Sequence, residues 1–403
     1  MRAPAAPTAP APATAPGFVA RLLPGALPPP AAGPYPVGVL PGEGIGPEVI
    51  ATCLRLLAAI ERATGIRFDI RTGGAIGVAA ERTAGQALTP EVTRFCADVF
   101  GAGGAVFCGP GGGRFVYDLR VTFNLFCKLV PLLPLPSLRG TGVLAPDAVR
   151  DVDILVVREN SGGLYLGEAG TESVGGRTRA WHRFHYDEDE VDRLLDLAVR
   201  AAQLRRGRLC VVTKPAGVPG ISALWRARAE ALSAGAGIDL QVLEIDNACY
   251  QLVAAARAFD VVAAPNMFGD VLADGASVLL GSRGMSYSAN YSPAGCAVYQ
   301  TGHGAAHDLA GTDRANPAGQ VQSLAMMLRE SFGLPGIAAA IVAALDDVLA
   351  AGYRTPDVMA PGCQRVGTRE FGEHVEAALL GRLAQSPADS APAAPRILAV
   401  AER

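Results

Sequence analysis

The 403-residue sequence lacks an excess of charge of either sign. Its 35 Lys and Arg residues nearly balance 38 Asp and Glu residues, which gives a formal net charge of −3. Without a basic surplus the chain has no general attraction to nucleic acid or to an anionic membrane, so an anionic ligand needs a local cluster of Lys and Arg. We therefore expect a small-molecule partner and no nucleic-acid partner.

Long hydrophobic runs and paired cysteines are missing as well. The longest apolar stretch, from Ile337 to Leu345, is far too short to cross a bilayer and predicts a buried helix. The eight cysteines are scattered without any C-x-x-C pair, which argues against a zinc ribbon and against a disulfide framework. These absences predict no membrane partner and a cytoplasmic location.

The two ends of the chain have few charges and are rich in alanine and proline. Residues 1–34 lack the uninterrupted apolar core and the cleavage site of a secretory signal. Proline at every few positions blocks both helices and strand pairing. The sequence therefore predicts a disordered leader over 1–34 and a similar flexible tail over 385–403.

Between these ends, short apolar runs alternate with helical patterns. Strands are expected at 36–40, 68–71, 105–108, 154–157, 209–213, 240–245 and 261–264, and helices at 49–60, 191–203 and 221–232. Such alternation predicts an α/β protein with a largely parallel core. The segment 129–138 contains Pro131, Pro134 and Pro136, and proline lacks a backbone donor. We expect an extended crossing between lobes there, and not a central strand.

Asp270 and Asp274 give the strongest local signal. They stand four residues apart in a helical context, so both carboxylates share one helix face. Two like charges this close repel unless a cation lies between them, and oxygen ligands suit Mg²⁺ or Mn²⁺. An isolated pair of this kind is more often a solvated helix face. Here the helix directly follows the apolar strand 261–264, where α/β sheets place ligands, and this favours a metal site.

The remaining motifs are weaker. The glycine turn at 42–46 does not have the G-x-G-x-x-G spacing of a dinucleotide fingerprint, and a tight strand-to-helix connection explains it equally well. The glycine-rich loop 109–113 lacks the GK[ST] of a phosphate loop and predicts a flexible hinge near the site. His182 and His185 have no cysteine or further histidine nearby, so a surface or interface role is favoured over metal binding.

Four segments together resemble one enzyme family. They are LPGEGIGPEV at 40–49, VRENSGGLYLGE at 157–168, FGDVLADGASVLLGSRGM at 268–285 and HGAAHDLAGTDRANP at 303–317. Each is similar to a motif of the isocitrate, isopropylmalate, tartrate and homoisocitrate dehydrogenases, and they follow in the family's order from about residue 37 to 332. The resemblance implies an isopropylmalate dehydrogenase-like α/β fold with two lobes around a large twisted mixed sheet.

The resemblance also implies the division into lobes and the quaternary structure. A large cofactor-binding lobe would comprise 35–125 plus 278–384. A smaller middle lobe, 126–277, would carry the dimer interface and the metal ligands. The active site would lie between the lobes and be completed by residues from both chains of a homodimer.

Catalytic, metal and substrate roles follow from the resemblance position by position. Lys214 matches the lysine that serves in deprotonating the substrate hydroxyl from across the dimer interface, and Tyr165 matches the tyrosine that helps to deliver a proton to the enolate. The metal ligands would be Asp270 and Asp274, with Asp246 from the partner subunit. The substrate-binding residues would be Arg120, Arg158, Lys128, Val116 and Tyr117.

The chemistry of oxidative decarboxylation needs residues of these types. A base and a Lewis acid are required to remove a proton from an alcohol while hydride leaves, and Mg²⁺ or Mn²⁺ supplies the Lewis acid. A lysine near the metal cation should have a lowered pKa. The resemblance places His303, Gly304 and Asn316 in the cofactor site. It places Asp308 beside the adenosine ribose, where a carboxylate repels a 2′-phosphate, and this predicts NAD over NADP.

Several positions depart from the family pattern. Val130 stands where the family has a second substrate-binding arginine, with Lys128 two residues earlier, and Ala216, Gln300 and Glu43 replace an asparagine, a glutamate and an aspartate. A missing guanidinium removes up to two charge-assisted bonds to a carboxylate. The substrate's acidic end would then be held differently. Val116 and Tyr117, at the positions that select the γ-substituent, favour an apolar or aromatic group.

The leading hypothesis is an NAD- and divalent-metal-dependent oxidative decarboxylation of a 3-substituted malate with a non-standard substituent. Two alternatives stay open at this point: an ordinary 3-isopropylmalate dehydrogenase, and a non-catalytic regulatory subunit of the same fold. A regulatory subunit would be expected to lose some of Lys214, Tyr165 and the three aspartates, and the sequence keeps them all.

Overall fold

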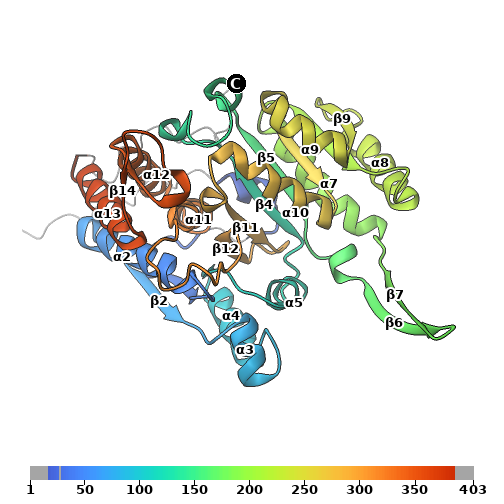
Figure 1. Cartoon of the computed structure of the whole chain (residues 1–403), viewed down its shortest axis with the longest axis horizontal. Coiled ribbons are helices and arrows are strands. Elements are labelled where there is room, and N and C mark those ends of the chain that lie inside the picture. The colour runs from blue at the N-terminus through green and yellow to red at the C-terminus, as the bar shows by residue number, and fades with distance from the viewer. Residues whose placement is uncertain (1–16, 27–28, 386–403) are drawn as a thin grey trace, which may run out of the picture.

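The computed structural model describes residues 17–26 and 29–385. Its centre is a ten-stranded mixed sheet in the order β2-β1-β3-β12-β11-β4-β5-β10-β8-β9 (Figure 1). The strands are β1 Tyr35–Leu40, β2 Phe68–Thr72, β3 Ala105–Cys108, β4 Cys127–Leu132, β5 Ile154–Glu159, β8 Arg208–Thr213, β9 Asp239–Glu244, β10 Val261–Ala264, β11 Tyr287–Tyr291 and β12 Ala297–Thr301. The predicted α/β fold around a large mixed sheet is confirmed.

Helices cover both halves of the sheet. The main ones are α2 Gly46–Thr64, α3 Gly77–Ala84, α4 Pro90–Gly101, α5 Phe115–Thr122, α7 Glu188–Gln203, α8 Pro219–Ser233, α9 Ile245–Ala254, α10 Asn266–Ala276, α11 Ala318–Glu330, α12 Pro335–Ala350 and α13 Thr368–Gln385. In Figure 1, α2 and α11 to α13 gather on one side and α7 to α9 on the other. Short elements complete the list: α1 Phe18–Leu22, α6 Pro146–Val149, β13 Tyr353–Arg354, β14 Gln364–Arg365 and the 3₁₀ turns at 136–138, 164–166, 256–258, 277–280, 283–285 and 356–358.

The sheet consists of two parallel halves joined by antiparallel strands. On one side β2, β1, β3 and β12 pair in parallel, and on the other side β5, β10, β8 and β9 do so. Between them, β11 and β4 pair antiparallel with each other and with their outer neighbours. The inner strands of both halves read as apolar runs because helices bury their faces, whereas the edge strands β2 and β9 are largely exposed.

The prediction that 129–138 avoids the sheet is wrong, because β4 lies in the middle of it. Pro131 faces Leu155 of β5. The backbone N–H of Leu155 points the other way, toward β10, and donates to the backbone carbonyl of Asp260. Pro131 and Leu155 form a non-hydrogen-bonded pair, so the missing donor of Pro131 points toward β11. The pairing of β4 with β11 runs only from Cys127 to Leu129 and has ended before the proline. A central strand therefore accommodates this proline without losing a ladder bond.

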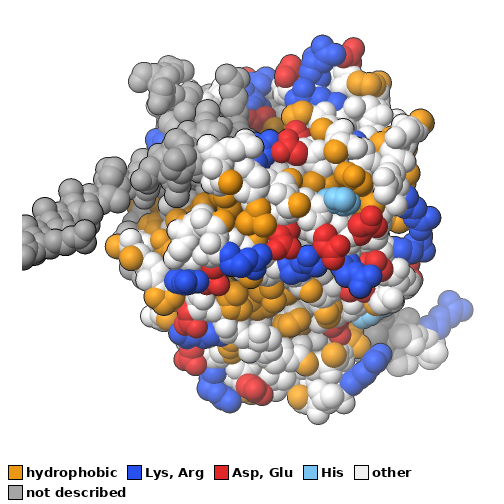
Figure 2. Space-filling model, turned by 90° about the vertical axis from the view of Figure 1, so that its left-hand side faces the viewer, with side chains coloured by type: hydrophobic (Ala, Val, Ile, Leu, Met, Phe, Trp, Pro, Cys, Tyr) orange, Lys and Arg blue, Asp and Glu red, His pale blue; other side chains and the backbone are white. Residues whose placement is uncertain are grey.

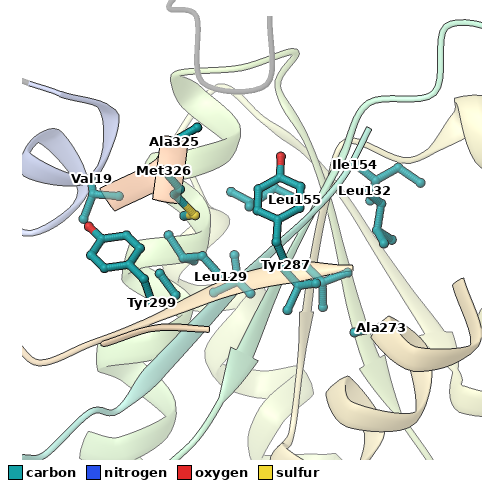
Figure 3. Close-up of a cluster of buried hydrophobic side chains, with 14 of the residues drawn as sticks. Val19, Leu129, Leu132, Ile154, Leu155, Ala273, Tyr287, Tyr299, Ala325 and Met326 are labelled. Carbon is teal, nitrogen blue, oxygen red and sulfur yellow. The ribbon is translucent and has the colours of Figure 1, made fainter. Parts of the chain in front are cut away.

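The predicted disordered leader is wrong for part of its length. Residues 1–16 and 27–28 lie outside the described residues, but α1 packs into the core with Phe18, Val19 and Leu22 almost fully buried. The Val19 amide donates to Glu330 of α11 at 3.0 Å, and Arg200 of α7 donates to the Leu22 carbonyl at 3.1 Å. Figure 3 shows Val19 beside Tyr299 and Met326. Four apolar side chains between 18 and 23 are buried, and this burial of apolar surface stabilises the helix although prolines flank it in the sequence.

Other parts of the domain prediction stay predictions. The lobe limits 35–125 plus 278–384 and 126–277 are not tested by the structure, and the tail beyond Gln385 lies outside the described residues. The hairpin formed by β6 Glu168–Val174 and β7 Arg177–Arg183 is exposed along almost its whole length and projects from the body (Figure 1). It carries the exposed His182, whose interface role remains a prediction.

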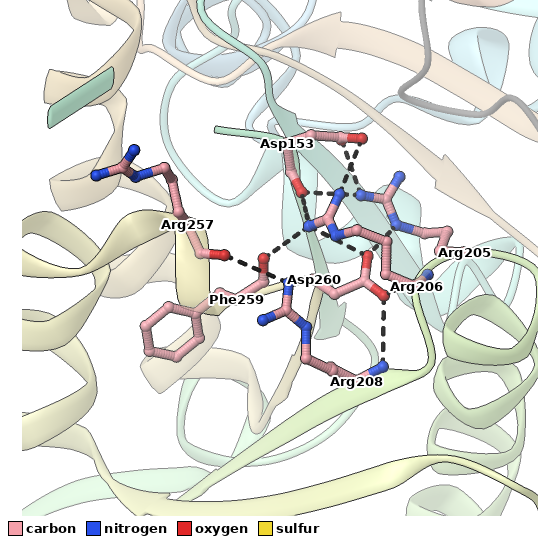
Figure 4. A network of polar contacts seen from close by, with 7 residues as sticks. All are labelled: Asp153, Arg205, Arg206, Arg208, Arg257, Phe259 and Asp260. Carbon is pink, nitrogen blue, oxygen red and sulfur yellow. Dashed lines mark hydrogen bonds and ion pairs between the residues drawn. The ribbon is translucent and has the colours of Figure 1, made fainter. Parts of the chain in front are cut away.

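A dense polar network closes the amino ends of β5, β10 and β8 (Figure 4). Asp260, which is 1% exposed, accepts from the Arg205 Nε at 2.7 Å and from the Arg206 backbone N–H at 2.7 Å. Asp153 accepts from Arg205 Nη2 at 2.8 Å and from Arg206 Nη1 at 3.2 Å. Every carboxylate in this network has basic partners, so its buried charges are compensated.

The surface agrees with the balanced composition. On the face shown in Figure 2, acidic and basic side chains are interspersed. Ion pairs such as Arg55–Glu376 and Arg382–Asp347 link α2, α12 and α13. Within the described part of the chain, no helix is long and apolar enough to span a membrane. All eight cysteines are free thiols, as their spacing predicts.

Candidate active site

The site centres on α10, which begins directly after β10. The helix lies on the sheet over β5 and β4, and Asp270 and Asp274 fall on one of its faces as predicted. A side chain at Gly269 would bring its Cβ within 2.9 Å of the Arg158 Cβ and Cγ. Glycine at this position therefore lets the helix approach the end of β5.

Arg158 is buried at the carboxyl end of β5 and is held from two sides. Its Nε and Nη2 donate to Asn266 Oδ1 at 3.1 and 2.8 Å, and its Nη1 donates to Asp270. Tyr165 Oη donates to the other Asp270 oxygen at 3.1 Å. The structure thus brings three of the predicted residues into one hydrogen-bonded group.

Two further cations are buried beside this group. Arg120 on α5 is 4% exposed and Lys128 on β4 is 6% exposed. Burial, reinforced by the charge of Arg158, lowers the pKa of Arg120 to about 9 and that of Lys128 to about 7. The Arg120 Nη1 has no hydrogen-bond partner within the described residues. A buried, unsatisfied guanidinium nitrogen is costly unless a ligand completes it.

The carboxylates of α10 respond to these cations. For Asp270, burial raises the pKa, but the charges of Arg158 and Lys128 outweigh it and the net pKa is lowered. For Asp274, burial dominates over Arg283 and the pKa is raised. Asp270 is therefore the more firmly ionised of the two.

The position of Val130 explains how the chain tolerates the missing arginine. Lys128 lies opposite Arg158 in the sheet, and Val130, two residues along, points to the same face. Val130 is 1% exposed and belongs to the hydrophobic core. The place of a second guanidinium is thus filled by an aliphatic contact, and the nearest buried cation on that strand is Lys128.

The aromatic ring of Tyr117 packs against residues of the basic cluster. Its ring meets that of Tyr165 edge-on with centroids 5.5 Å apart, and the guanidinium of Arg120 lies 5.5 Å from the Tyr117 centroid. Val116 precedes it on α5 and packs against a second apolar cluster. Both residues predicted to select the substituent therefore stand on the helix that carries Arg120.

Lys214 and Asp246 form hydrogen bonds with each other and not with this cluster in the described residues of the single chain. The Lys214 Nζ donates to Glu244 and Asp246, both at 2.8 Å, at the partly exposed ends of β8 and β9. The hydrogen bonds that Lys214 donates to Asp246 and Glu244 raise its pKa, opposite to the lowered pKa expected beside a metal cation. Among the described residues, no group of three or more His, Cys, Asp or Glu side chains is placed to hold a metal.

A pocket of about 540 Å³ opens next to the far end of α10. Arg283 connects the two regions, since it donates to Asp274 at 2.5 Å and also lines the pocket. Three of the predicted cofactor residues line it: His303, Gly304 and Asn316. Asp308 is exposed and is not among the lining residues, so its proposed place beside a ribose stays a prediction.

The first glycine turn closes this pocket. A Cβ on Gly44, whose φ is +57°, would lie 2.0 Å from the Ala305 carbonyl oxygen, so only glycine fits. The neighbouring Ile45 N–H donates to the same oxygen at 2.9 Å, and its side chain lines the pocket. Glu43 accepts from Gly112 at 2.7 Å and from Ala79 at 2.6 Å. The glycine-rich loop expected to be a hinge is therefore tied to this turn.

Sequence reasoning missed two residues that build these regions. Asn266 is fully buried and holds Arg158, and its place directly after an apolar strand was the available signal. Asp357 lines the pocket and accepts from Asn316 at 3.0 Å and from Ser282 at 2.5 Å. No local pattern marks Asp357, because it comes from a segment more than forty positions away from Asn316 in the sequence.

The donor set fits a divalent cation in part. Asp270 and Asp274 offer hard oxygen ligands on one helix face, and each now accepts hydrogen bonds from a cationic side chain. Two carboxylates do not complete an octahedral shell, so further oxygens from a ligand, water or a second chain are required. The residues present are thus compatible with Mg²⁺ or Mn²⁺ at this place.

Comparisons with known proteins agree with this geometry. Residues 36–375 match the model of the isocitrate/isopropylmalate dehydrogenase family. The chain is 40% identical over 363 residues to a 3-isopropylmalate dehydrogenase of Gloeobacter violaceus, covering 86% of this chain and 98% of that protein. It is 38% identical over 356 residues to one of Moorella thermoacetica, covering 85% and 98%.

A solved structure supports the same conclusion at the level of the fold. The isocitrate dehydrogenase of Methylococcus capsulatus superimposes with a TM-score of 0.76 at 27% identity, over 86% of this chain and 99% of that one. The resemblance inferred from four sequence segments is therefore confirmed over most of the chain. On these grounds the chain belongs to the isocitrate/isopropylmalate dehydrogenase family.

Proposed function

We propose that the protein catalyses the NAD- and divalent-metal-dependent oxidative decarboxylation of a 3-substituted malate. The observation that carries this proposal is the cluster of three buried basic side chains, Arg120, Lys128 and Arg158, which outnumber the two carboxylates of α10 beside them, Asp270 and Asp274. Such an excess of buried positive charge is stable only if an anion completes it. A malate with two carboxylates provides that charge.

The residues of the cluster have distinct tasks under this proposal. Arg158 and Arg120 bind carboxylates through N–H groups left free by their protein partners. Lys128 contributes a single positive charge where a second arginine would contribute a guanidinium with several N–H donors. Tyr165, whose pKa is raised to about 12 by burial and by Asp270, stays protonated near neutral pH and serves as the proton donor.

Asp270 and Asp274 would hold the metal, together with Asp246 of a second copy. A divalent cation in this place polarises the substrate hydroxyl and stabilises the charge left when the carboxylate departs. Lys214 of the second copy would accept the hydroxyl proton. This arrangement explains why Lys214 and Asp246 pair with each other, away from the cluster, within one chain.

The shared site has a direct test in mixed dimers. Lys214→Ala and Asp270→Asn would be inactive singly, but a mixed dimer carries one site with both changes and one with neither. After subunit exchange, shown by native mass spectrometry, we expect up to about a quarter to a half of wild-type activity per mixed dimer. Demonstrated exchange without any activity would exclude sites shared in this way.

NAD is the proposed cofactor, bound in the pocket beside His303, Gly304 and Asn316. The preference over NADP rests on the carboxylate of Asp308, which would repel a 2′-phosphate. A higher kcat/KM with NADP than with NAD would overturn the role given to Asp308. A cytoplasmic location completes the proposal and rests on the unpaired cysteines.

The identity of the substituent distinguishes two candidate functions. Val130, Lys128 and Tyr117 favour a non-standard apolar or aromatic group. The relatives named 3-isopropylmalate dehydrogenase, at about 40% identity, favour the ordinary isopropyl group. A regulatory role is the weakest of the alternatives, because Tyr165, Asp270 and Arg158 keep a connected, buried arrangement.

A panel of 3-substituted malates tests the proposal. NADH formation with Mg²⁺ or Mn²⁺ would rank hydrogen, methyl, isopropyl, benzyl and carboxymethyl side groups in one experiment. We expect turnover of at least one alkyl- or arylmalate. The absence of turnover with all of them, in protein shown to be folded, would contradict the proposed reaction.

A further inference from the structure

Asn266 is the first residue of α10, and all of its polar groups but one N–H are engaged. Its side chain is fully buried. Oδ1 accepts from two nitrogens of Arg158, Nδ2 donates to the Gly162 carbonyl at 2.8 Å, and the backbone N–H donates to the Tyr186 hydroxyl at 2.9 Å. One residue thus joins β5, the loop after it and the start of α10.

Each of these bonds leads to a different part of the candidate site. Arg158 is the buried carboxylate-binding group, and Asp270 lies one helical turn after Asn266. Gly162 belongs to the loop that leads into the turn Leu164–Leu166, which carries Tyr165. That loop is also held by Glu159, which accepts from the Gly162 N–H at 3.0 Å. Asn266 therefore connects the residue that binds the substrate with the segment that places the proton donor.

The number of N–H donors on Arg158 indicates what the contact with Asn266 does. A guanidinium has five N–H donors in a fixed plane. Asn266 takes two of them and Asp270 takes one, so among the described residues one N–H on each terminal nitrogen stays available. Donors on the two terminal nitrogens can bind a carboxylate. The amide oxygen of Asn266 fixes the plane in which they point.

We infer that Asn266 is a positioning residue that orients the Arg158 guanidinium toward the substrate carboxylate and, through Gly162, sets the place of Tyr165. The inference rests on the proposed function for the identity of the substrate. An amide is required because the residue must accept from Arg158 and donate to a carbonyl oxygen at the same time. Neither an aspartate nor an alanine does both.

Two substitutions separate the two tasks. Asn266→Asp keeps an acceptor for Arg158 but sets a carboxylate oxygen against the Gly162 carbonyl, so we expect kcat to fall at least about tenfold while KM stays within about threefold. Asn266→Ala removes both bonds, so we expect the same loss in kcat and a rise in KM of at least about tenfold. Leu345→Ala, in the buried face of α12, serves as a control for lost stability alone. It should leave both constants unchanged.

A measurement without substrate makes the test independent of the proposed reaction. The Arg158 Nε–H, assigned in the ¹⁵N spectrum by its loss in Arg158→Lys, should exchange slowly with solvent in the wild type. It should stay protected in Asn266→Asp and lose protection in Asn266→Ala. Equal protection in all three proteins would overturn the orienting role even if no malate is turned over. Where the wild type is active, unchanged kcat in both variants would overturn the link to Tyr165.

If the wild type turns over none of the malates, the proposed function fails while the exchange experiment still decides the role of Asn266. If the wild type is active and both variants behave like Leu345→Ala, the proposed function stands and the role of Asn266 fails. The two conclusions are thus tested separately.

Discussion

Strands β5 and β10 have a cluster of basic and acidic residues at each end, and the two clusters differ in how they are paired. At the amino ends, Asp153 and Asp260 are matched by Arg205 and Arg206 (Figure 4). At the carboxyl ends, Arg158 shares Asp270 with Tyr165, while one nitrogen of Arg120 has no hydrogen-bond partner among residues 17–26 and 29–385. Buried charge alone therefore does not mark a binding site. In this protein the candidate substrate-binding residues belong to the cluster that is incompletely paired among the described residues.

The difference follows from the cost of burying ions. A paired buried cluster is stable in the folded chain but gains nothing from a ligand, because its donors and acceptors are already used. A cluster with spare donors is costly in the free protein, and a ligand anion recovers that cost on binding. The amino-end cluster thus fixes the strands, and the carboxyl-end cluster is available for chemistry.

The test with the largest expected effect replaces one carboxylate of each cluster by an amide. We expect Asp270→Asn to lower kcat by at least about a thousandfold, because the proposed metal ligand and the partner of Arg158 and Tyr165 are both weakened. Asp260→Asn should keep the activity of each folded molecule but reduce the free energy of unfolding by about 3–5 kcal/mol. Kinetics and urea denaturation of both variants measure this. The contrast fails if Asp270→Asn stays active or if Asp260→Asn is as stable as the wild type.

Lys128 provides a test of the unpaired cluster through pH. Burial lowers the Lys128 pKa from 10.5 to about 7; the charges of Arg158 and Arg120 lower it further, and Asp270 and Asp274 partly oppose them. Below pH 7 the amine is charged and binds an anion, so the affinity for a malate should weaken as pH rises through about 7. Lys128→Met should bind about ten- to a hundredfold more weakly at pH 6 and lose this pH dependence.

The lowered pKa of Lys128 also affects stability, and here the effect of pH is opposite: the free energy of unfolding rises with pH while the affinity for an anion falls. Between about pH 7 and 10.5 the unfolded chain binds the Lys128 proton and the folded chain does not. Stability then rises with pH across this window by the contribution of that group. The wild type should therefore gain stability relative to Lys128→Met as pH increases from 7 to 10. An unchanged difference between the two proteins would contradict a buried, neutral amine.

Val130→Arg would add a further positive charge to the carboxyl-end cluster and so increase the difference between the two clusters. If the pocket is built for an ordinary alkylmalate, the new guanidinium gives a bidentate partner and lowers KM for isopropylmalate. If the pocket is built for another substrate, an unpaired charge in place of a core side chain costs several kcal/mol and impairs activity. We expect the second outcome. Efficient turnover of isopropylmalate by the wild type, or a large gain in the variant without other loss, would favour the ordinary enzyme.

The smallest effect is expected at the solvent-exposed side of the paired cluster. The Arg206 side chain is 38% exposed, whereas that of Arg205 is 2% exposed. Arg206→Ala should therefore cost only about 1 kcal/mol of unfolding free energy and leave the kinetics unchanged. A loss as large as that of Asp260→Asn would show that the exposed arginine is as important to the network as the buried one.

Much of the fold was predictable because the sequence patterns are local. The strands at 105–108 and 261–264 have the predicted bounds, and the predicted helices at 49–60 and 191–203 form the inner parts of α2 and α7. Pairing was not predictable in the same way. Whether Pro131 breaks a strand depends on which neighbour its backbone faces, and only the register of β4 decides that. The burial of α1 likewise depends on α7 and α11, far away in sequence.

By itself the sequence determined the alternation of strands and helices, the helical spacing of Asp270 and Asp274, and the family motifs, since each of these is written within a few consecutive residues. Only the tertiary structure decided which charges meet. It gave Asp260 several basic partners, left one nitrogen of Arg120 without a partner in the part of the chain that the structure describes, and placed Asn266 between Arg158 and Gly162. The physical reason is that the cost of a buried charge depends on its neighbours in space, which the order of residues along the chain does not specify.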